Sequence, residues 1–146
     1  MKGDLRASVV LALFCLIVAV PLFAHHGGST VYDYTNRIEG KAIVTELVWR
    51  NPHAQLFFNM TDNTGKTVNW GVELNSPGNL VRTGWTPKSF AVGDEITVVF
   101  IPSKGDGAFG ACGDFVRADG KKFQNGQFCG AEMSTLPVRP DYVIKK

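Results

Sequence analysis

The sequence predicts an all-β, mostly antiparallel domain of five strands with one short helix. Three observations support this fold class. Apolar and polar residues alternate with a period of two through much of residues 38–118. Turn residues separate the alternating runs, and a segment with helix-start and helix-stop residues lies between the third and the fourth run. The 146 residues contain no internal repeat and no low-complexity tract, which is consistent with one domain.

The first strand, within residues 40–51, is long and changes phase. Ala42 and Val44 share one face, whereas Leu47 and Trp49 share a face in the shifted phase. A slip of one residue moves every later side chain to the other face of a strand. The pattern therefore predicts a β-bulge or a bend between Val44 and Leu47.

Four further strands are predicted by alternation and by the turns that bound them. Residues 54–60 alternate before the Asp-Asn-Thr-Gly turn at 62–65, and residues 67–74 alternate after it. A fourth strand follows a Gly–Asp turn within 91–102, and a fifth, within 111–123, ends at an Asp–Gly hairpin turn. The predicted core consists of Val44, Leu56, Phe58, Val68, Trp70, Val72, Leu80, Ile96, Val98 and Phe100.

A short helix is predicted between the third and the fourth strand. Ser76 is a suitable N-cap, Pro77 suits the first helical position, and Gly84 can end the helix. Leu80 and Val81 are expected to be its buried residues. This order of elements matches a small five-stranded Greek-key barrel of the oligonucleotide/oligosaccharide-binding (OB) type. An open β-sandwich is the alternative.

Residues 1–24 are predicted to be a secretory signal peptide. A short basic start precedes the apolar run 7–23, and Ala24 supplies the small residue before the cleavage point. The run is also about the minimum length of a bilayer span, so an uncleaved membrane anchor is the alternative. A lipoprotein signal is excluded because the residue before Cys15 is not small. We therefore expect a periplasmic or secreted protein whose only membrane contact would be an uncleaved leader.

Three segments would follow the leader: an N-terminal arm at 25–37, the OB-like barrel at 38–118 and a C-terminal tail at 119–146. The arm is polar and contains glycine, so we expect it to be loosely held. Outside the leader the chain has two cysteines, Cys112 and Cys129, and an even number in an exported chain favours a disulfide. Closing this loop would stabilise the fold by about 3 kcal/mol in the chain-entropy account.

The composition argues against nucleic-acid binding and against catalysis. The formal net charge is only +2, from 15 Lys and Arg against 13 Asp and Glu, whereas proteins that bind polyanions carry a basic excess. The chain has only three histidines and shows no Ser–His–Asp or Cys–His arrangement. We therefore predict a binding protein that is not an enzyme, with a small ligand or an envelope protein as its partner.

Four motifs give the chain a resemblance to a known family. They are AHH at 24–26, G-x-A-x-V-x-x-L-x-W-x-NPHA at 40–54, W-x-VEL-x-SP-x-x-L-x-x-x-GW at 70–85 and GD-x-I-x-V at 93–98. The combination resembles a bacterial family of exported proteins of unknown function. The resemblance covers residues 24–101 and implies a small exported β-barrel with no established activity. The Gly-Gly after the histidine pair and the cysteine-bearing tail depart from the family pattern.

The histidines are the strongest candidates for chemistry. Cleavage after Ala24 would make His25 the amino terminus, and its α-amine and imidazole Nδ1 could then chelate one metal ion. His26 or His53 would add a further nitrogen, and such a tetragonal nitrogen set suits Cu(II). Glu73 is a candidate hydrogen-bond partner that would orient His53.

Each of these interpretations has a structural alternative. The histidine pair could simply be tolerated beside a cleavage site, and His53, after an Asn–Pro turn, could hydrogen-bond a loop carbonyl. If metal is bound, the arm must fold back on the barrel, and Gly27 and Gly28 would allow the bend. Two functions stay open: an exported copper-binding module, and a metal-free ligand- or protein-binding accessory barrel of an envelope complex. Three tryptophans could line a ligand face, although core packing is favoured: Trp49, Trp70 and Trp85.

Overall fold

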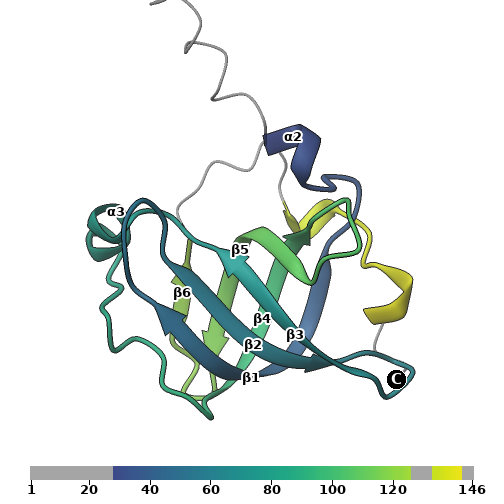
Figure 1. Ribbon diagram of the computed structural model, residues 1–146. Helices are drawn as coiled ribbons and strands as arrows, with labels where there is room; N and C mark the ends of the chain where they lie inside the picture. The colour runs from purple at the N-terminus through teal and green to yellow at the C-terminus, as the bar shows by residue number, and fades with distance from the viewer. Residues whose placement is uncertain (1–27, 126–132, 143–146) are drawn as a thin grey trace, which may run out of the picture.

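The computed structural model describes residues 28–125 and 133–142 (Figure 1). The predicted leader, His25, His26 and Cys129 lie outside these described residues. No helix within them is long and apolar enough to span a membrane. In chain order the elements are α2 (Gly28–Val31), β1 (Ile38–Val48), β2 (Gln55–Thr61), β3 (Thr67–Glu73), α3 (Pro77–Arg82), β4 (Glu95–Pro102), β5 (Phe109–Arg117), β6 (Lys122–Gln124), and the 3₁₀ turns η2 (Met133–Thr135) and η3 (Pro140–Tyr142).

Five strands close into a barrel, which confirms the predicted fold class. The antiparallel pairs are β1 with β2, β1 with β4, β2 with β3, and β4 with β5. A short parallel pairing of β3 with β5 closes the ring, so the barrel is mixed rather than purely antiparallel. The helix α3 joins β3 to β4, as an OB-like Greek key requires (Figure 1). Strand β6 pairs with β5 outside the ring, across the predicted Asp–Gly turn.

The phase slip predicted in the first strand is a β-bulge. Val44 pairs with Phe58 and Glu46 pairs with Phe57, so two steps along β1 match one step along β2. Thr45 is the extra residue of this bulge. The apolar residues on both sides of it can therefore point into one core although their spacing in the sequence changes.

A second bulge, which the sequence analysis missed, lies in β5 at Cys112. Val99 pairs with Asp114 and Ile101 with Ala111, which leaves one extra residue on β5. Cys112 has a φ of 60°, a left-handed conformation that is uncommon for a residue other than glycine. It is disulfide-bonded. The predicted pairing with the cysteine at position 129 falls on a residue outside those described and stays a prediction.

The core contains the residues that alternation predicted. Nine of the ten predicted core residues are buried, and Val68 is half-buried and packs against them. The ring of Phe58 meets that of Phe100 edge-on at 5.7 Å, and Trp70 lies 5.1 Å from Phe100. Trp70 and Trp85 are buried and Trp49 packs against the core, so the tryptophans serve packing rather than a ligand face.

The helix α3 begins one residue after Ser76, as expected, but differs in two details. The Ser76 side chain makes no capping hydrogen bond, and Asn75 Oδ1 accepts from the Ser76 N–H at 2.8 Å instead. The prediction that Val81 is buried was wrong: it is 58% exposed, whereas Leu80 is fully buried. A helix of six residues presents one narrow face to the core, and adjacent positions point about 100° apart.

The expectation of a loosely held arm was wrong for its described part. The Asp33 N–H donates to the Pro102 carbonyl at 2.8 Å, and Arg37 forms a β-bridge with Val138. The Arg37 guanidinium also donates to three backbone carbonyls of the tail. A second, small apolar cluster joins the two terminal segments to the barrel; it consists of Ile101, Ala111 and Cys112, with Tyr32, Tyr34, Met133 and Leu136 packed against them.

Candidate functional site

The structure brings His53 and Glu73 together at one end of the barrel. His53 lies in the loop between β1 and β2, directly after the cis Asn51–Pro52 bond, and Glu73 is the last residue of β3. The next residue in each segment is buried, and the Leu74 N–H donates to the Ala54 carbonyl at 2.9 Å. This backbone contact holds the loop against the end of β3. As a result His53 Nδ1 lies 2.7 Å from Glu73 Oε1.

This contact gives His53 the arrangement of an oriented ligand. The His53 side chain is 48% exposed and that of Glu73 is 28% exposed, so the pair lies at the surface. A neutral imidazole that donates its Nδ1–H to a carboxylate carries its lone pair on Nε2. Metal-binding histidines usually have such a second contact, because the carboxylate fixes the ring and raises its basicity. In that neutral form the Nε2 lone pair of His53 would be available to a ligand.

Tyr32, which comes from the N-terminal segment, contacts the other oxygen of the same carboxylate. Its hydroxyl donates to Glu73 Oε2 at 3.3 Å. Burial and the Glu73 charge raise the pKa of Tyr32 to about 12, so the phenol is a hydrogen-bond donor at neutral pH. A β-bridge to Ser103 fixes the tyrosine at the end of β4. The three side chains form one connected group, called below the His53–Glu73–Tyr32 chain.

His53 and Glu73 were predicted from the sequence as site residues, whereas Tyr32 was not. A tyrosine in a polar segment carries no signal of its own, and it lies 41 residues before Glu73. The β-bridge between Tyr32 and Ser103 brings Tyr32 to this end of the barrel, and the sequence gives no sign of that bridge. His25 and His26 lie outside the described residues, so their predicted role as ligands stays a prediction.

The described residues alone do not make a complete metal site. Within 28–125 and 133–142, no group of three or more His, Cys, Asp or Glu side chains could hold a metal ion. His53 and Glu73 provide at most two such side chains. Any further ligands would have to come from residues outside the described ranges.

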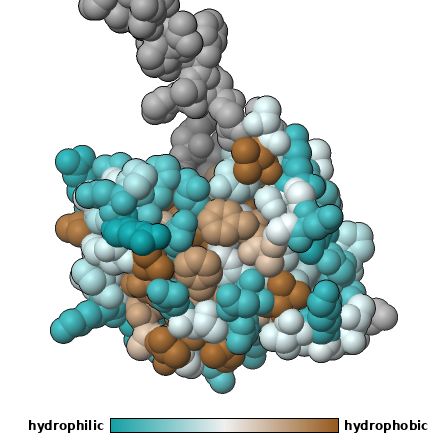
Figure 2. Space-filling model, viewed as in Figure 1, coloured by the Kyte–Doolittle hydropathy of each residue, from teal (hydrophilic) through white to brown (hydrophobic). Residues whose placement is uncertain are grey.

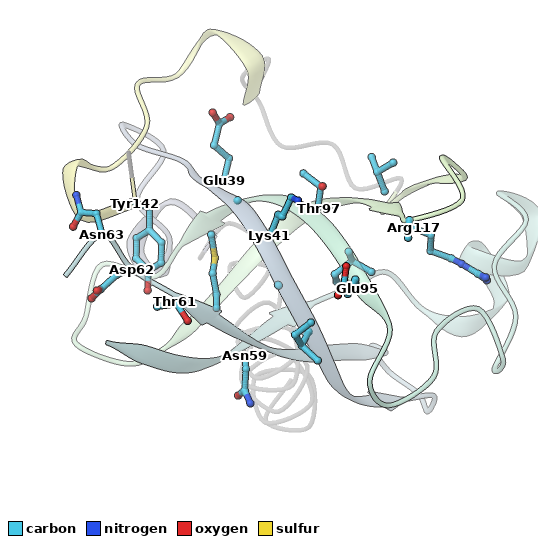
Figure 3. A pocket seen from close by; sticks show the side chains of 17 residues that line it. Glu39, Lys41, Asn59, Thr61, Asp62, Asn63, Glu95, Thr97, Arg117 and Tyr142 are labelled. Atoms are coloured by element: carbon cyan, nitrogen blue, oxygen red, sulfur yellow. The ribbon is translucent and has the colours of Figure 1, made fainter. Parts of the chain in front are cut away.

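A groove of about 960 Å³ lies elsewhere, along β1 (Figure 3). Of the predicted site residues that the structure describes, namely His53, Glu73 and Cys112, none lines it. Ile43 lies between Asn59 and Glu95 in the strand register, and Lys41 lies opposite Thr97. In Figure 3 the labelled polar side chains spread along β1 and its neighbours and do not converge on one point. The groove is therefore an open surface along β1 without a convergent cluster of polar side chains among the labelled residues.

The comparisons with known proteins bear on the family and not on the activity. No curated protein and no solved structure gives a match to this chain. A family model does match, over residues 12–112, which is more than half of the chain and includes the whole His53–Glu73–Tyr32 chain. The description of that family carries no activity to transfer. On this match the chain belongs to DUF6152, a family of unknown function.

Proposed function

We propose that this protein is an exported OB-like barrel, not an enzyme, that binds one Cu(II) ion between its mature amino terminus and His53. It would act as a copper carrier or sensor. The observation that carries the proposal is the His53–Glu73–Tyr32 chain. The carboxylate that orients His53 is held by Tyr32, a residue of the segment that leads back to His25 and His26.

The geometry of the arm supports a shared site. Tyr32 follows His26 by six positions, which is an extended reach of about 20 Å. Four of the residues between them form α2, which shortens that reach. Because Tyr32 already contacts Glu73, the remaining distance from the arm to His53 is short compared with the reach.

The chemistry of the donors favours copper over other divalent ions. His25 at a free amino terminus would offer its α-amine and Nδ1, and His53 would offer Nε2. Three nitrogens in one plane match the tetragonal preference of Cu(II), which also heads the affinity order for nitrogen ligands. Export would both create the free amino terminus and place the protein where it meets extracytoplasmic copper.

The test uses the amino terminus itself. Cu(II) titration of a chain that begins at His25 is compared with the same chain acetylated at its α-amine. Acetylation removes the amine donor of the chelate and leaves the barrel unchanged, so we expect the affinity to fall by about a hundredfold or more. His53→Ala should weaken binding by about tenfold, with the melting temperature of the metal-free protein unchanged. Equal affinity for both amino termini would contradict the proposal.

The second candidate function is a metal-free accessory barrel that binds a ligand or an envelope protein. The groove along β1 supports it, because an open groove with a volume of about 960 Å³ is large enough for a small molecule or an extended segment. A chain that begins at His25, binds no Cu(II) and still keeps its fold would favour this function over the first.

A further inference from the structure

Two half-buried phenylalanines and a glycine form a row across three strands on the outside of the barrel. Phe57 of β2 lies opposite Gly71 of β3, and Gly71 lies opposite Phe109 of β5. Leu56 and Phe58, the neighbours of Phe57 along β2, are fully buried, so Phe57 points outward. Neither Phe57 nor Phe109 belongs to the two apolar clusters of the described residues.

The two rings lie over the backbone of Gly71. A Cβ atom at this position would stand 2.6 Å from Phe57 Cε1 and 2.9 Å from Phe109 Cδ2. Gly71 is accordingly buried, although it faces outward on β3. The missing side chain lets the two rings approach and form one apolar ledge, called here the Phe57–Phe109 ledge. Figure 2 shows hydrophobic residues gathered in the middle of this face, over β2, β3 and the start of β5.

Hydrogen-bonding side chains flank the ledge on both sides. On one side Asn69 Nδ2 donates to Asn59 Oδ1 at 2.8 Å and to Thr45 Oγ1 at 3.0 Å. On the other side Gln55 lies opposite Glu73 in the strand register. Amides and a hydroxyl can both donate hydrogen bonds to sugar hydroxyl groups and accept from them, whereas a carboxylate accepts only.

The charge of this face selects between the two classes of ligand that OB-type barrels bind on strands 2 and 3, oligonucleotides and oligosaccharides. Neither β2 nor β3 contains a lysine or an arginine. A surface that binds single-stranded nucleic acid needs basic groups along the phosphate backbone, and this face has none on those strands. A neutral sugar needs no such groups.

We propose that the Phe57–Phe109 ledge binds a neutral oligosaccharide. The apolar C–H face of a sugar ring would lie on the two phenyl rings, and its hydroxyl groups would bond to Asn69 and to the other flanking side chains. The proposal goes beyond copper binding and does not depend on it, because neither ring is a metal ligand.

The test is a titration of the full chain, treated with a chelator, with cellohexaose, chitohexaose and maltohexaose, followed by backbone amide NMR. We expect at least one sugar to shift the signals of Phe57, Gly71 and Phe109, with a Kd below about 1 mM. Phe57→Ala should weaken binding by about tenfold or more, whereas Phe57→Trp, which keeps an aromatic ring, should retain it.

Two further variants keep the test decisive if Phe57→Ala does not fold. Asn69 is exposed, so Asn69→Ala should fold and weaken binding several-fold. Ile43→Ala is the matched control, since Ile43 is 41% exposed and lies in the groove along β1 instead of the ledge. The proposal is overturned if no sugar shifts these signals, if the shifts map to the groove, or if a short single-stranded DNA binds more tightly than the sugars.

Discussion

The barrel and the two terminal segments are held in place by different interactions. Inside the barrel the contacts are between apolar side chains, such as the edge-on rings of Phe58 and Phe115. The terminal segments combine one small apolar cluster with a few polar anchors. Arg37 donates to the carbonyls of the tail, and Trp70 Nε1 donates to the Tyr142 hydroxyl at 2.8 Å. The barrel is stabilised by the burial of many side chains, whereas each polar anchor depends on a single donor group.

This difference matters for the candidate site, because the site joins the two regions. His53 and Glu73 belong to the barrel, and Tyr32 belongs to the N-terminal segment. A change in the barrel should therefore affect the whole protein. A change in an anchor should affect the terminal segments and Tyr32 while the barrel keeps its fold.

The largest expected effect is in the barrel core. Phe58 is fully buried and touches the rings of Phe100 and Phe115. Phe58→Ala should lower the free energy of unfolding by about 3–5 kcal/mol, from lost burial and from the cavity left behind. Urea denaturation measures it. The exposed Val92→Ala serves as the control and should change stability by less than about 0.5 kcal/mol; equal losses would mean that the core assignment is wrong.

The next effect concerns the disulfide of Cys112. Cys129→Ser should lower the free energy of unfolding by about 3 kcal/mol if position 129 is the partner. The loss should appear first in the apolar cluster that Cys112 shares with Tyr32 and Met133. Thiol labelling of the exported protein should find no reactive thiol. Two reactive thiols would contradict the predicted pairing.

The strand pattern of the barrel could be predicted because it depends on local alternation. The bulge at Thr45 was readable as a one-residue phase slip, since the core requires Val44 and Leu47 to point to the same interior. The exposure of Val81 could not be predicted in the same way. Two adjacent apolar residues on one helical turn cannot both face a core, and only the docking angle decides which one does.

The site was partly predictable for a similar reason. The Glu73 carboxylate was a candidate partner of His53 from residue chemistry, and the structure places the two in contact. The contacts of Tyr32 and of the row formed by Phe57 and Phe109 depend on strand register across long stretches of chain. Alternation shows that Phe57 faces outward, but it does not show which residues lie beside it.

A smaller effect is expected at the anchor that ties the tail to the N-terminal segment. The Arg37 side chain is 15% exposed and donates to the carbonyls of Met133 and Ser134. Arg37→Ala should cost about 2 kcal/mol, because three backbone carbonyls of the tail lose a charged donor. Hydrogen exchange should rise at residues 133–142 and stay unchanged in β2 and β3. Arg37→Lys is the conservative control and should restore part of the stability; a uniform rise in exchange would show that the two regions are not separable.

The smallest expected effect is a pH dependence at Tyr32, where the two regions meet. The pKa of a tyrosine in an unfolded chain is near 10, whereas burial and the Glu73 charge raise it to about 12 in the folded protein. Between these values the folded state keeps a proton that the unfolded state has lost, so the free energy of unfolding falls as the pH rises. The contribution is fully present below pH 10 and is lost as the pH approaches 12. Because Tyr32 is more than a third exposed, screening reduces the effect to about 1 kcal/mol.

The measurement compares the protein with its Tyr32→Phe variant by urea denaturation from about pH 9 to pH 12. All other titrating groups are shared by the two proteins, so their contributions cancel in the difference, including that of Tyr142, whose pKa is also raised by burial. The protein with Tyr32 should lose more stability over this range than the variant does. Parallel curves would mean that Tyr32 does not donate to Glu73 in solution. The link from the N-terminal segment to His53 would then be absent, and with it the geometric support for a shared copper site.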